Sequence, residues 1–498
     1  MRTFIPSSAA ATTSQQARSP FGLARAVATC LALAAGSAAT AQSFQQGDLY
    51  LLSPAITGGG AGNGALVRLR PSDGSAVIVR NLAATPQFSD GLTFDTHRNA
   101  MLFVAQLVVG GPYQLWQCDA AGNTVGLGSV GSGFAAFAPT GDGRVYLRDL
   151  QEIPAGRIHY LDAGNQMHTL LDSTGTAPFE FFPGQATQYR CMHFHAPTNA
   201  LFVAQSSGST QVCGGGAATT HLAIRRVPLS ADGTRVVGPV GCAEFEVSTT
   251  GEVVVGLDQV DDGTLLAIVD TNSNAAEPRM VRIDPWTMAT STFATNGSYV
   301  GAAATNAGCY SSTLGSAVVH DTFSNGLRGF LAGQAGGGTP MTFSVPLSPG
   351  GSSGEITTLV EVRGTPCGGT FVGYGDGLAG SGGFVPMLRA TGCPVPGAPL
   401  DLHVAAALGG GTCVLALGTD PAAVPMFGGT VLLTPLVFVT ISLAGTPLTA
   451  GEGHLAVPLV LPANPSITGL SLYGQAAVLD PSAVQGIALT PGLRIVIG

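Results

Sequence analysis

From Gly47 to about Val362, hydrophobic residues form short runs that alternate with polar residues and stop at turns. Two of these runs are almost the same string: NAMLFVAQ (residues 99–106) returns as NALFVAQ (residues 199–205), one residue shorter. Each copy follows a shorter stretch centred on phenylalanine, LTFD (residues 92–95) and MHFH (residues 192–195). Strings repeated at such a distance are typical of a repeated β unit.

Two kinds of predicted strand recur along this region. The first kind carries the repeated string and is expected at residues 48–52, 91–106, 134–149, 192–205 and 252–270. The second kind runs into a polar turn, often Asp-Gly or Asp-Pro, and is expected at residues 67–74, 115–122, 158–164, 224–233, 280–285 and 343–351. Such turns indicate hairpins. The six turns lie roughly 42 to 70 residues apart, which is the spacing of propeller blades with insertions.

Two short motifs carry a resemblance to known propellers. DGLTFD (residues 90–95) and RIDP (residues 282–285) resemble blade motifs of six-bladed β-propellers of the NHL and gluconolactonase-like kind. The resemblance covers about 320 residues and implies a propeller over residues 42–365, with six or seven blades. Residues 48–52 would complete the last blade and close the ring, which removes exposed strand edges.

The composition changes near Cys367. Residues 366–498 hold only seven charged residues, and their apolar runs are short and separated by Pro and Gly. We expect strands at residues 400–407, 413–417, 430–433, 436–443, 455–461, 469–477 and 494–497, forming a C-terminal β-sandwich. The Gly-rich segment 373–383 is expected to be a linker or a first loop. This module resembles those appended to low-charge exported bacterial proteins, which implies a sorting or attachment role.

The first 41 residues have the features of an export signal. Arg18 and Arg25 precede an apolar run at residues 26–35, and Ala39-Thr40-Ala41 is a small-x-small cleavage pattern. We expect a mature chain from Gln42 that is secreted or held at the cell surface. The uncharged stretch 421–451 is long enough to span a membrane, but Pro and Gly break it into short β-branched pieces, so no membrane span is expected beyond the signal.

The charge of the chain disfavours nucleic acid. The net charge is −9, and removal of residues 1–41 takes away three arginines and no acidic residue. Phosphate binding needs clustered cations. The partner is therefore expected to be a protein or carbohydrate ligand of unknown identity.

Eight cysteines remain after removal of the signal, which in an exported chain favours disulfides. Cys393–Cys413 is the candidate pair in the sandwich, and Cys191–Cys213 or Cys213–Cys242 are the alternatives in the propeller.

Few residues suggest chemistry. His193 and His195 would share one face of a strand and could hold a metal, but their counterparts Thr93 and Asp95 favour polar, half-exposed positions. Asp270, Asn272 and Asn274 resemble the start of a calcium loop, yet the glycine and the closing glutamate are missing. These five residues are the metal candidates.

No nucleophile stands beside an evident base, and the metal ligands of gluconolactonases cannot be placed on this sequence. We therefore expect an all-β, exported, non-catalytic scaffold or binding protein without a required cofactor. The alternative is a metal-dependent lactonase or sugar-processing hydrolase.

Overall fold

The computed structural model describes residues 43–53, 64–83, 91–108, 111, 113–129, 134–149, 157–180, 189–205, 221–246, 253–270, 279–295, 307–321, 326–334, 338–341, 358–364 and 367–498. Residues 44–498 form one compact unit. Strands dominate this unit, with four single-turn 3₁₀ helices in the described residues: η1 (Ala196–Thr198), η2 (Ser381–Gly383), η3 (Pro465–Ile467) and η4 (Val484–Gly486). The all-β class expected from the sequence is confirmed.

Within the described residues up to Glu361, the strands form six antiparallel four-stranded sheets. The first is β24 (Thr358–Glu361), β1 (Leu49–Ser53), β2 (Gly64–Arg70) and β3 (Ser75–Leu82); the second is β4 (Leu92–Asp95), β5 (Ala100–Ala105), β6 (Gln114–Cys118) and β7 (Thr124–Ser129). The third is β8 (Phe134–Pro139), β9 (Val145–Asp149), β10 (Ile158–Leu161) and β11 (Met167–Thr169); the fourth is β12 (Tyr189–His195), β13 (Ala200–Gln205), β14 (His221–Pro228) and β15 (Gly241–Glu246). The fifth is β16 (Val253–Gln259), β17 (Leu265–Asp270), β18 (Arg279–Ile283) and β19 (Thr290–Thr295); the sixth is β20 (Gly308–Ser311), β21 (Ser316–Asp321), β22 (Gly326–Leu331) and β23 (Thr339–Met341).

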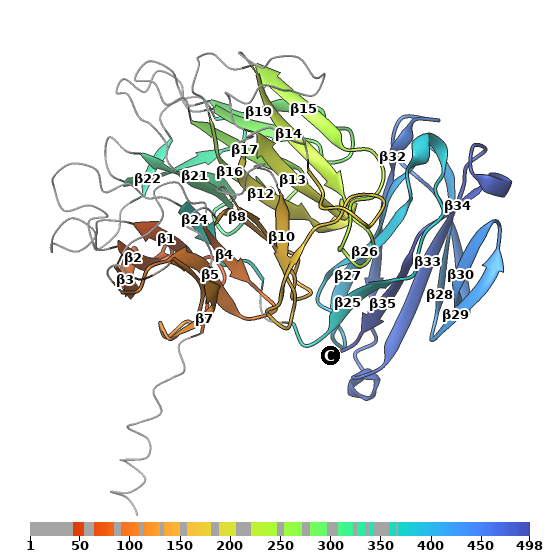
Figure 1. The fold of residues 1–498 in the computed structure, drawn as a ribbon, viewed down its shortest axis with the longest axis horizontal. Helices are drawn as coiled ribbons and strands as arrows, with labels where there is room; N and C mark the ends of the chain where they lie inside the picture. The colour runs from red at the N-terminus through yellow and green to blue at the C-terminus, as the bar shows by residue number, and fades with distance from the viewer. Residues whose placement is uncertain are drawn as a thin grey trace, which may run out of the picture. The chain divides into compact units, whose positions relative to one another are not determined.

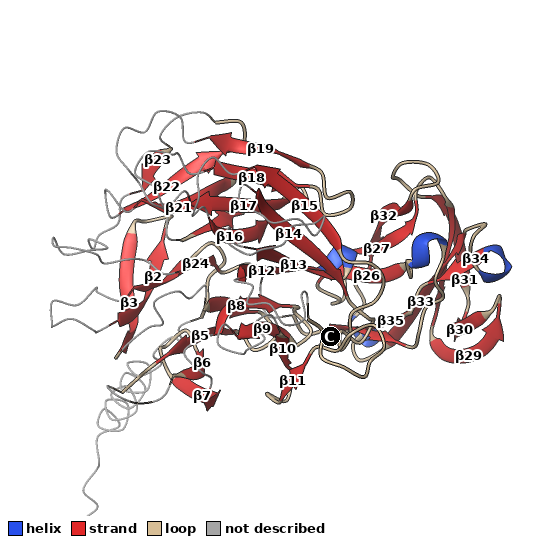
Figure 2. Cartoon of the chain, turned by 45° about the horizontal axis from the view of Figure 1, so that its top comes forward, coloured by secondary structure: helices blue, strands red, loops and turns tan. Residues whose placement is uncertain are grey.

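The six sheets follow one another around a ring. The first strand of each sheet contacts the first strand of the next, in the order β4, β8, β12, β16, β20, β24, and β24 returns to β4. Strand β1 pairs antiparallel with β24, so a strand from the far end of this region joins the N-terminal hairpin. Figures 1 and 2 show this propeller-like arrangement, and Figure 1 shows β1 near β24. The pairing completes this sheet with strands from both ends of the region and so closes the ring.

The repeated apolar string forms the second strand of a sheet, and both of its faces are covered. In β13, Phe202 packs into a core shared with Leu265 of the next sheet, whereas Leu201 packs into a core shared with Tyr146 of the preceding sheet. A strand that is buried on both faces has apolar residues at consecutive positions, and this accounts for the repeated apolar sequence. Asn99 and Asn199, which begin the two copies, both have φ of 47°, and asparagine tolerates this left-handed turn position.

The C-terminal module is built from a six-stranded sheet, a three-stranded sheet and a two-stranded hairpin. The first sheet contains β25 (Thr370–Tyr374), β35 (Gly492–Val496), β33 (Ser471–Leu479), β28 (Thr412–Gly418) and β31 (Val437–Ser442), with β34 (Ile487–Leu489) beside β33. The second sheet contains β26 (Met387–Gly392), β27 (Pro399–Leu408) and β32 (Ala450–Val460), and β29 (Asp420–Met426) pairs with β30 (Gly429–Thr434). Val404 of the second sheet and Leu415 and Val478 of the first share one buried core, as in a β-sandwich.

Both segments of this module that the sequence singled out contain strands. The uncharged stretch 421–451 forms the strands β29 to β31 and the start of β32. No helix in the described residues is long and apolar enough to cross a membrane. The linker interpretation of residues 373–383 is wrong at its start, because Gly373 and Tyr374 belong to β25 and pair with β35. Gly373 also lies so close to the propeller that an added Cβ would clash with the carbonyl oxygen of Ala231.

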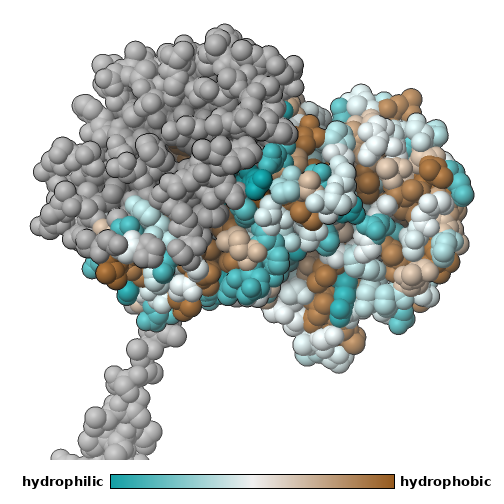
Figure 3. All heavy atoms as spheres, in the orientation of Figure 1, coloured by the Kyte–Doolittle hydropathy of each residue, from teal (hydrophilic) through white to brown (hydrophobic). Residues whose placement is uncertain are grey.

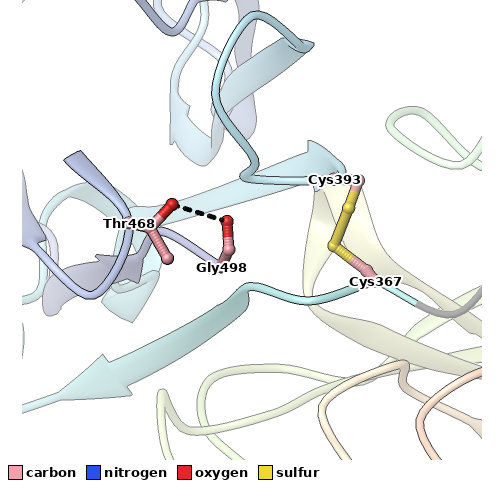
Figure 4. The surroundings of a disulfide bond; sticks show 4 residues. All are labelled: Cys367, Cys393, Thr468 and Gly498. Carbon is pink, nitrogen blue, oxygen red and sulfur yellow. Dashed lines mark hydrogen bonds between the residues drawn. A yellow bond between two sulfur atoms is a disulfide. The ribbon is translucent and has the colours of Figure 1, made fainter. Parts of the chain in front are cut away.

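The cysteine pairing differs from the expected one. Cys393 is bonded to Cys367 (Figure 4), so the predicted Cys393–Cys413 bridge is wrong. Cys413 is a buried thiol in the sandwich core. Cys191 is also a thiol, which donates a hydrogen bond to the carbonyl oxygen of Val254, so the Cys191–Cys213 bridge is wrong as well. The observed bridge joins the end of β26, in the second sheet of the module, to the chain just before β25.

Cys242 is disulfide-bonded, whereas Cys213 lies outside the described residues. Cys118 and Cys309 are buried thiols. Four of the seven described cysteines are therefore thiols, and all four lie in apolar cores, where cysteine behaves as a small hydrophobic residue.

Candidate functional site

A cavity of about 340 Å³ lies where the six first strands meet. Each strand contributes lining residues, among them Thr93, Phe137, His193, Asp258, Cys309 and Glu361. The charged lining groups come from the C-terminal ends of β16 and β24 and from Arg363, which follows β24, and β12 contributes His193. This cavity, called the channel from here on, is the first candidate for a functional site in the described part of the propeller.

Arg363 binds both carboxylates of the channel. Its Nη1 and Nη2 donate to Oδ1 and Oδ2 of Asp258, each at 2.9 Å, and its Nε donates to Oε2 of Glu361 at 3.0 Å. The guanidinium also donates to the carbonyl oxygens of Gln259 and Tyr310 and lies over the Tyr310 ring. One cation thus joins three successive sheets, including the sheet that closes the ring.

The two carboxylates have further donors. Asp258 accepts the backbone N–H groups of Gln259 at 2.8 Å and of Tyr310 at 3.0 Å. Glu361, which is 3% exposed, accepts both N–H and O–H of Ser312 as well as the Ser311 hydroxyl and the Thr313 N–H. Burial raises the pKa of Glu361, but these hydrogen bonds and Arg363 outweigh it, so its pKa lies below the usual range.

His193 is a further titratable group that lines the channel. Its Nδ1 lies 3.9 Å from Oδ1 of Asp258, and its Nε2 is buried and has no hydrogen-bond partner among the described residues. Burial lowers the pKa of His193, and Asp258 only partly opposes this shift. The imidazole is therefore neutral at pH 7.

His195 is more deeply buried than the sequence predicted. It is 1% exposed, so the half-exposed interpretation is wrong for this residue. Its Nε2 donates to the carbonyl oxygen of Gly263 at 3.2 Å, and its Nδ1 then accepts from the Thr198 hydroxyl at 2.9 Å. Burial, followed by the neighbouring His193, lowers the pKa of His195 to about 3. With both nitrogens in hydrogen bonds, no lone pair remains for a metal.

The equivalent position in the second sheet, Asp95, has the same kind of role. Asp95 is fully buried and accepts from Nη1 of Arg98. Arg98 in turn donates to the carbonyl oxygens of Gly143 and Asp162 in the third sheet. His195 connects the fourth sheet to the fifth similarly, through its hydrogen bond to the carbonyl oxygen of Gly263. These polar positions at the ends of first strands therefore connect neighbouring sheets.

The structure describes only some of the metal candidates. Asp270 ends β17, and Asn272 and Asn274 lie outside the described residues. His193 and His195 are two residues apart on β12, but only His193 lines the channel. Nowhere in the described ranges do three His, Cys, Asp or Glu residues form a group that could hold a metal ion.

Sequence reasoning missed the network of Asp258, Glu361 and Arg363. The available signal was the pair of charges in the segment TLVEVR (residues 358–363), which interrupts an otherwise apolar strand. Nothing in the sequence indicated that Asp258, about a hundred residues earlier, would meet this pair.

No family model matches the chain, and no curated protein matches it. Among solved structures, the chain is similar to a gluconolactonase from Xanthomonas campestris, 16% identical over 53% of this chain and 78% of that one, with a TM-score of 0.35. It is also similar to the β-propeller domain of Cps50 (Swd1) from Myceliophteria thermophila, 12% identical over 51% of this chain and 85% of that one, with a TM-score of 0.29. A dihydro-heme d1 dehydrogenase is 11% identical over 91% of this chain and 75% of its own, with a TM-score of 0.30. The strand pairing and the ring of first strands make the chain an all-β, propeller-like protein.

Proposed function

We propose that this chain is an exported, non-catalytic β-propeller scaffold or binding protein of the extracellular space or cell envelope, and that it needs no cofactor. The observation that supports this proposal is the hydrogen bonding of the channel carboxylates. All four oxygens of Asp258 and Glu361 accept hydrogen bonds, and Arg363 neutralises part of their charge. A carboxylate whose lone pairs are filled is poorly suited to take a proton or hold a metal ion.

The C-terminal module is proposed to act in attachment or sorting. Its surface carries few charges and several large apolar side chains, among them Phe438 on β31, which is 64% exposed, and Leu448, which is 78% exposed. Figure 3 shows hydrophobic residues spread over this part of the surface. Leu436, Val437 and Phe438 are consecutive and each is more than half exposed, and contiguous exposed apolar residues are typical of surfaces that contact another molecule.

One observation favours the alternative of a metal-dependent lactonase or sugar-processing hydrolase. His193 presents a neutral imidazole to the channel; its Nε2 has no hydrogen-bond partner in the described part of the chain, and Asp258 lies beside its Nδ1. Such a pair could act as a general base. The alternative therefore makes His193 its essential residue.

The test measures hydrolysis of sugar lactones by the secreted protein, together with its melting temperature in calcium, zinc and manganese. We expect no hydrolysis and no substantial shift in melting temperature. The matched variants are His193→Ala and Arg282→Gln, since Arg282 pairs with Asp262 outside the channel. Metal-dependent hydrolysis that His193→Ala abolishes and Arg282→Gln retains would replace the scaffold proposal by the hydrolase.

A further inference from the structure

A second cavity, of about 450 Å³, lies between the propeller and the C-terminal module. Its propeller wall includes Thr140, Arg144 and Tyr146, and its module wall includes Phe371 and Arg389. It shares residues such as Thr96 and Phe194 with the channel, so the module covers one end of the channel. We propose that this cavity binds a small molecule bearing a carboxylate or phosphate group.

Arg389 supplies the first cation. It lies on β26, and its Nη2 donates to the carbonyl oxygen of Ala231 at 2.8 Å. Its Nε is buried without a hydrogen-bond partner in the described part of the chain. Burial lowers the pKa of Arg389. A buried guanidinium with an unused donor is costly unless an acceptor reaches it.

Arg144 supplies the second cation from the opposite wall. It lies 5.2 Å above the Tyr160 ring centroid, and its Nε is also buried without a partner among the described residues. The carboxylate beside it is that of Asp142, whose Oδ2 is 4.0 Å from Nη1 of Arg144 and whose other oxygen accepts from Thr140 and from the backbone N–H of Arg144. The cavity lining therefore contains two arginines, Arg144 and Arg389, and one acidic residue, Asp142.

This composition matches an oxyanion. Guanidinium groups bind carboxylates and phosphates through paired hydrogen bonds, more strongly than neutral donors do. The cavity volume is in the range of small-molecule sites, and Phe194 and Phe371 give it apolar walls for the rest of the molecule. The site lies outside the Asp258–Arg363–Glu361 network, so it goes beyond the function proposed above.

The test is calorimetric titration of the full secreted chain at low ionic strength with inorganic phosphate and with citrate, using sodium chloride as the ionic-strength control. We expect one saturable site for at least one of the two anions, and a preference between them identifies the group that is bound. Arg389→Gln and, separately, Arg144→Gln should each weaken binding at least tenfold. Arg282→Gln is the matched control, because it removes an arginine elsewhere on the propeller, and it should leave the affinity unchanged.

Melting curves of each variant separate loss of binding from loss of folding, and Arg144→Gln leaves the Arg389 contact to Ala231 in place. Absence of saturable binding of both anions, or equal affinities in wild type and in a folded Arg144→Gln variant, would overturn the inference. Neither outcome affects the proposed function, which is tested by hydrolysis and not by anion binding.

Discussion

At the scale of single residues, the polar positions at the ends of the first strands hold sheets together. Asp95 accepts a hydrogen bond from Arg98, and Asp258 accepts one from Arg363. His195 donates a hydrogen bond to the carbonyl oxygen of Gly263. The sequence predicted that Thr93 and His193, and likewise Asp95 and His195, would be equivalent positions. It could not predict their burial, because burial depends on the next sheet of the ring: Arg98 meets Gly143 at a separation of 45 residues and His195 meets Gly263 at a separation of 68.

The buried neutral His195 predicts a dependence of stability on pH. Its pKa is about 3 in the folded protein, whereas an unfolded histidine titrates near 6.5. The contribution of the neutral imidazole to the free energy of unfolding is therefore complete above pH 6.5 and is lost as the pH falls towards 3. Between pH 6.5 and 5 this linkage amounts to about 2 kcal/mol of the free energy of unfolding. Denaturant titrations at a series of pH values should show the loss.

His195→Gln should be less stable at pH 7 but should lose less stability between pH 6.5 and 5 than wild type does. His97→Gln, which changes an exposed histidine, serves as the control and should keep the wild-type slope. An unchanged slope in His195→Gln would contradict the role assigned to this imidazole.

At the scale of elements, the second strands of the sheets were the best predicted. Alternate residues of β1 show why: Leu49 and Leu51 pack with Val318 of one neighbouring sheet, whereas Leu52 packs with Met101 of the other. Strands covered on both faces give long apolar runs that are easy to recognise. The module was harder, because its Gly-rich start resembles a linker although Gly373 belongs to β25.

Arg363 joins elements that are distant in sequence, so its loss should weaken the closure of the ring. Arg363→Gln leaves Asp258 and Glu361 without their cation in a buried setting, and we expect a loss of roughly 3 kcal/mol in the free energy of unfolding. Arg282→Gln breaks an exposed pair and should cost about 1 kcal/mol or less. Equal losses in the two variants, measured by chemical denaturation, would show that the Arg363 network does not stabilise closure.

At the scale of the whole molecule, the propeller and the C-terminal module pack together within the unit of residues 44–498. Trp286 of the propeller stacks on His454 of the module at 4.6 Å between ring centroids, and Arg389 donates to Ala231. Composition indicated two regions but gave no sign of this packing. A contact between two surfaces leaves no periodic pattern in either sequence.

The four described thiols report on whether this unit unfolds as a whole. Cys118, Cys191 and Cys309 lie in propeller cores and Cys413 in the module core, and burial raises the pKa of Cys118 and of Cys413 to about 12. Because the thiolate is the reactive form, none of the four should react with a thiol reagent in the native protein.

In increasing denaturant without reductant, peptide mapping should find all four thiols labelled over one common range of denaturant concentration, since the packed interface couples the propeller and the module. Labelling of Cys413 at clearly lower denaturant than the propeller thiols would show that the module unfolds independently, and labelling in the native protein would contradict the burial itself.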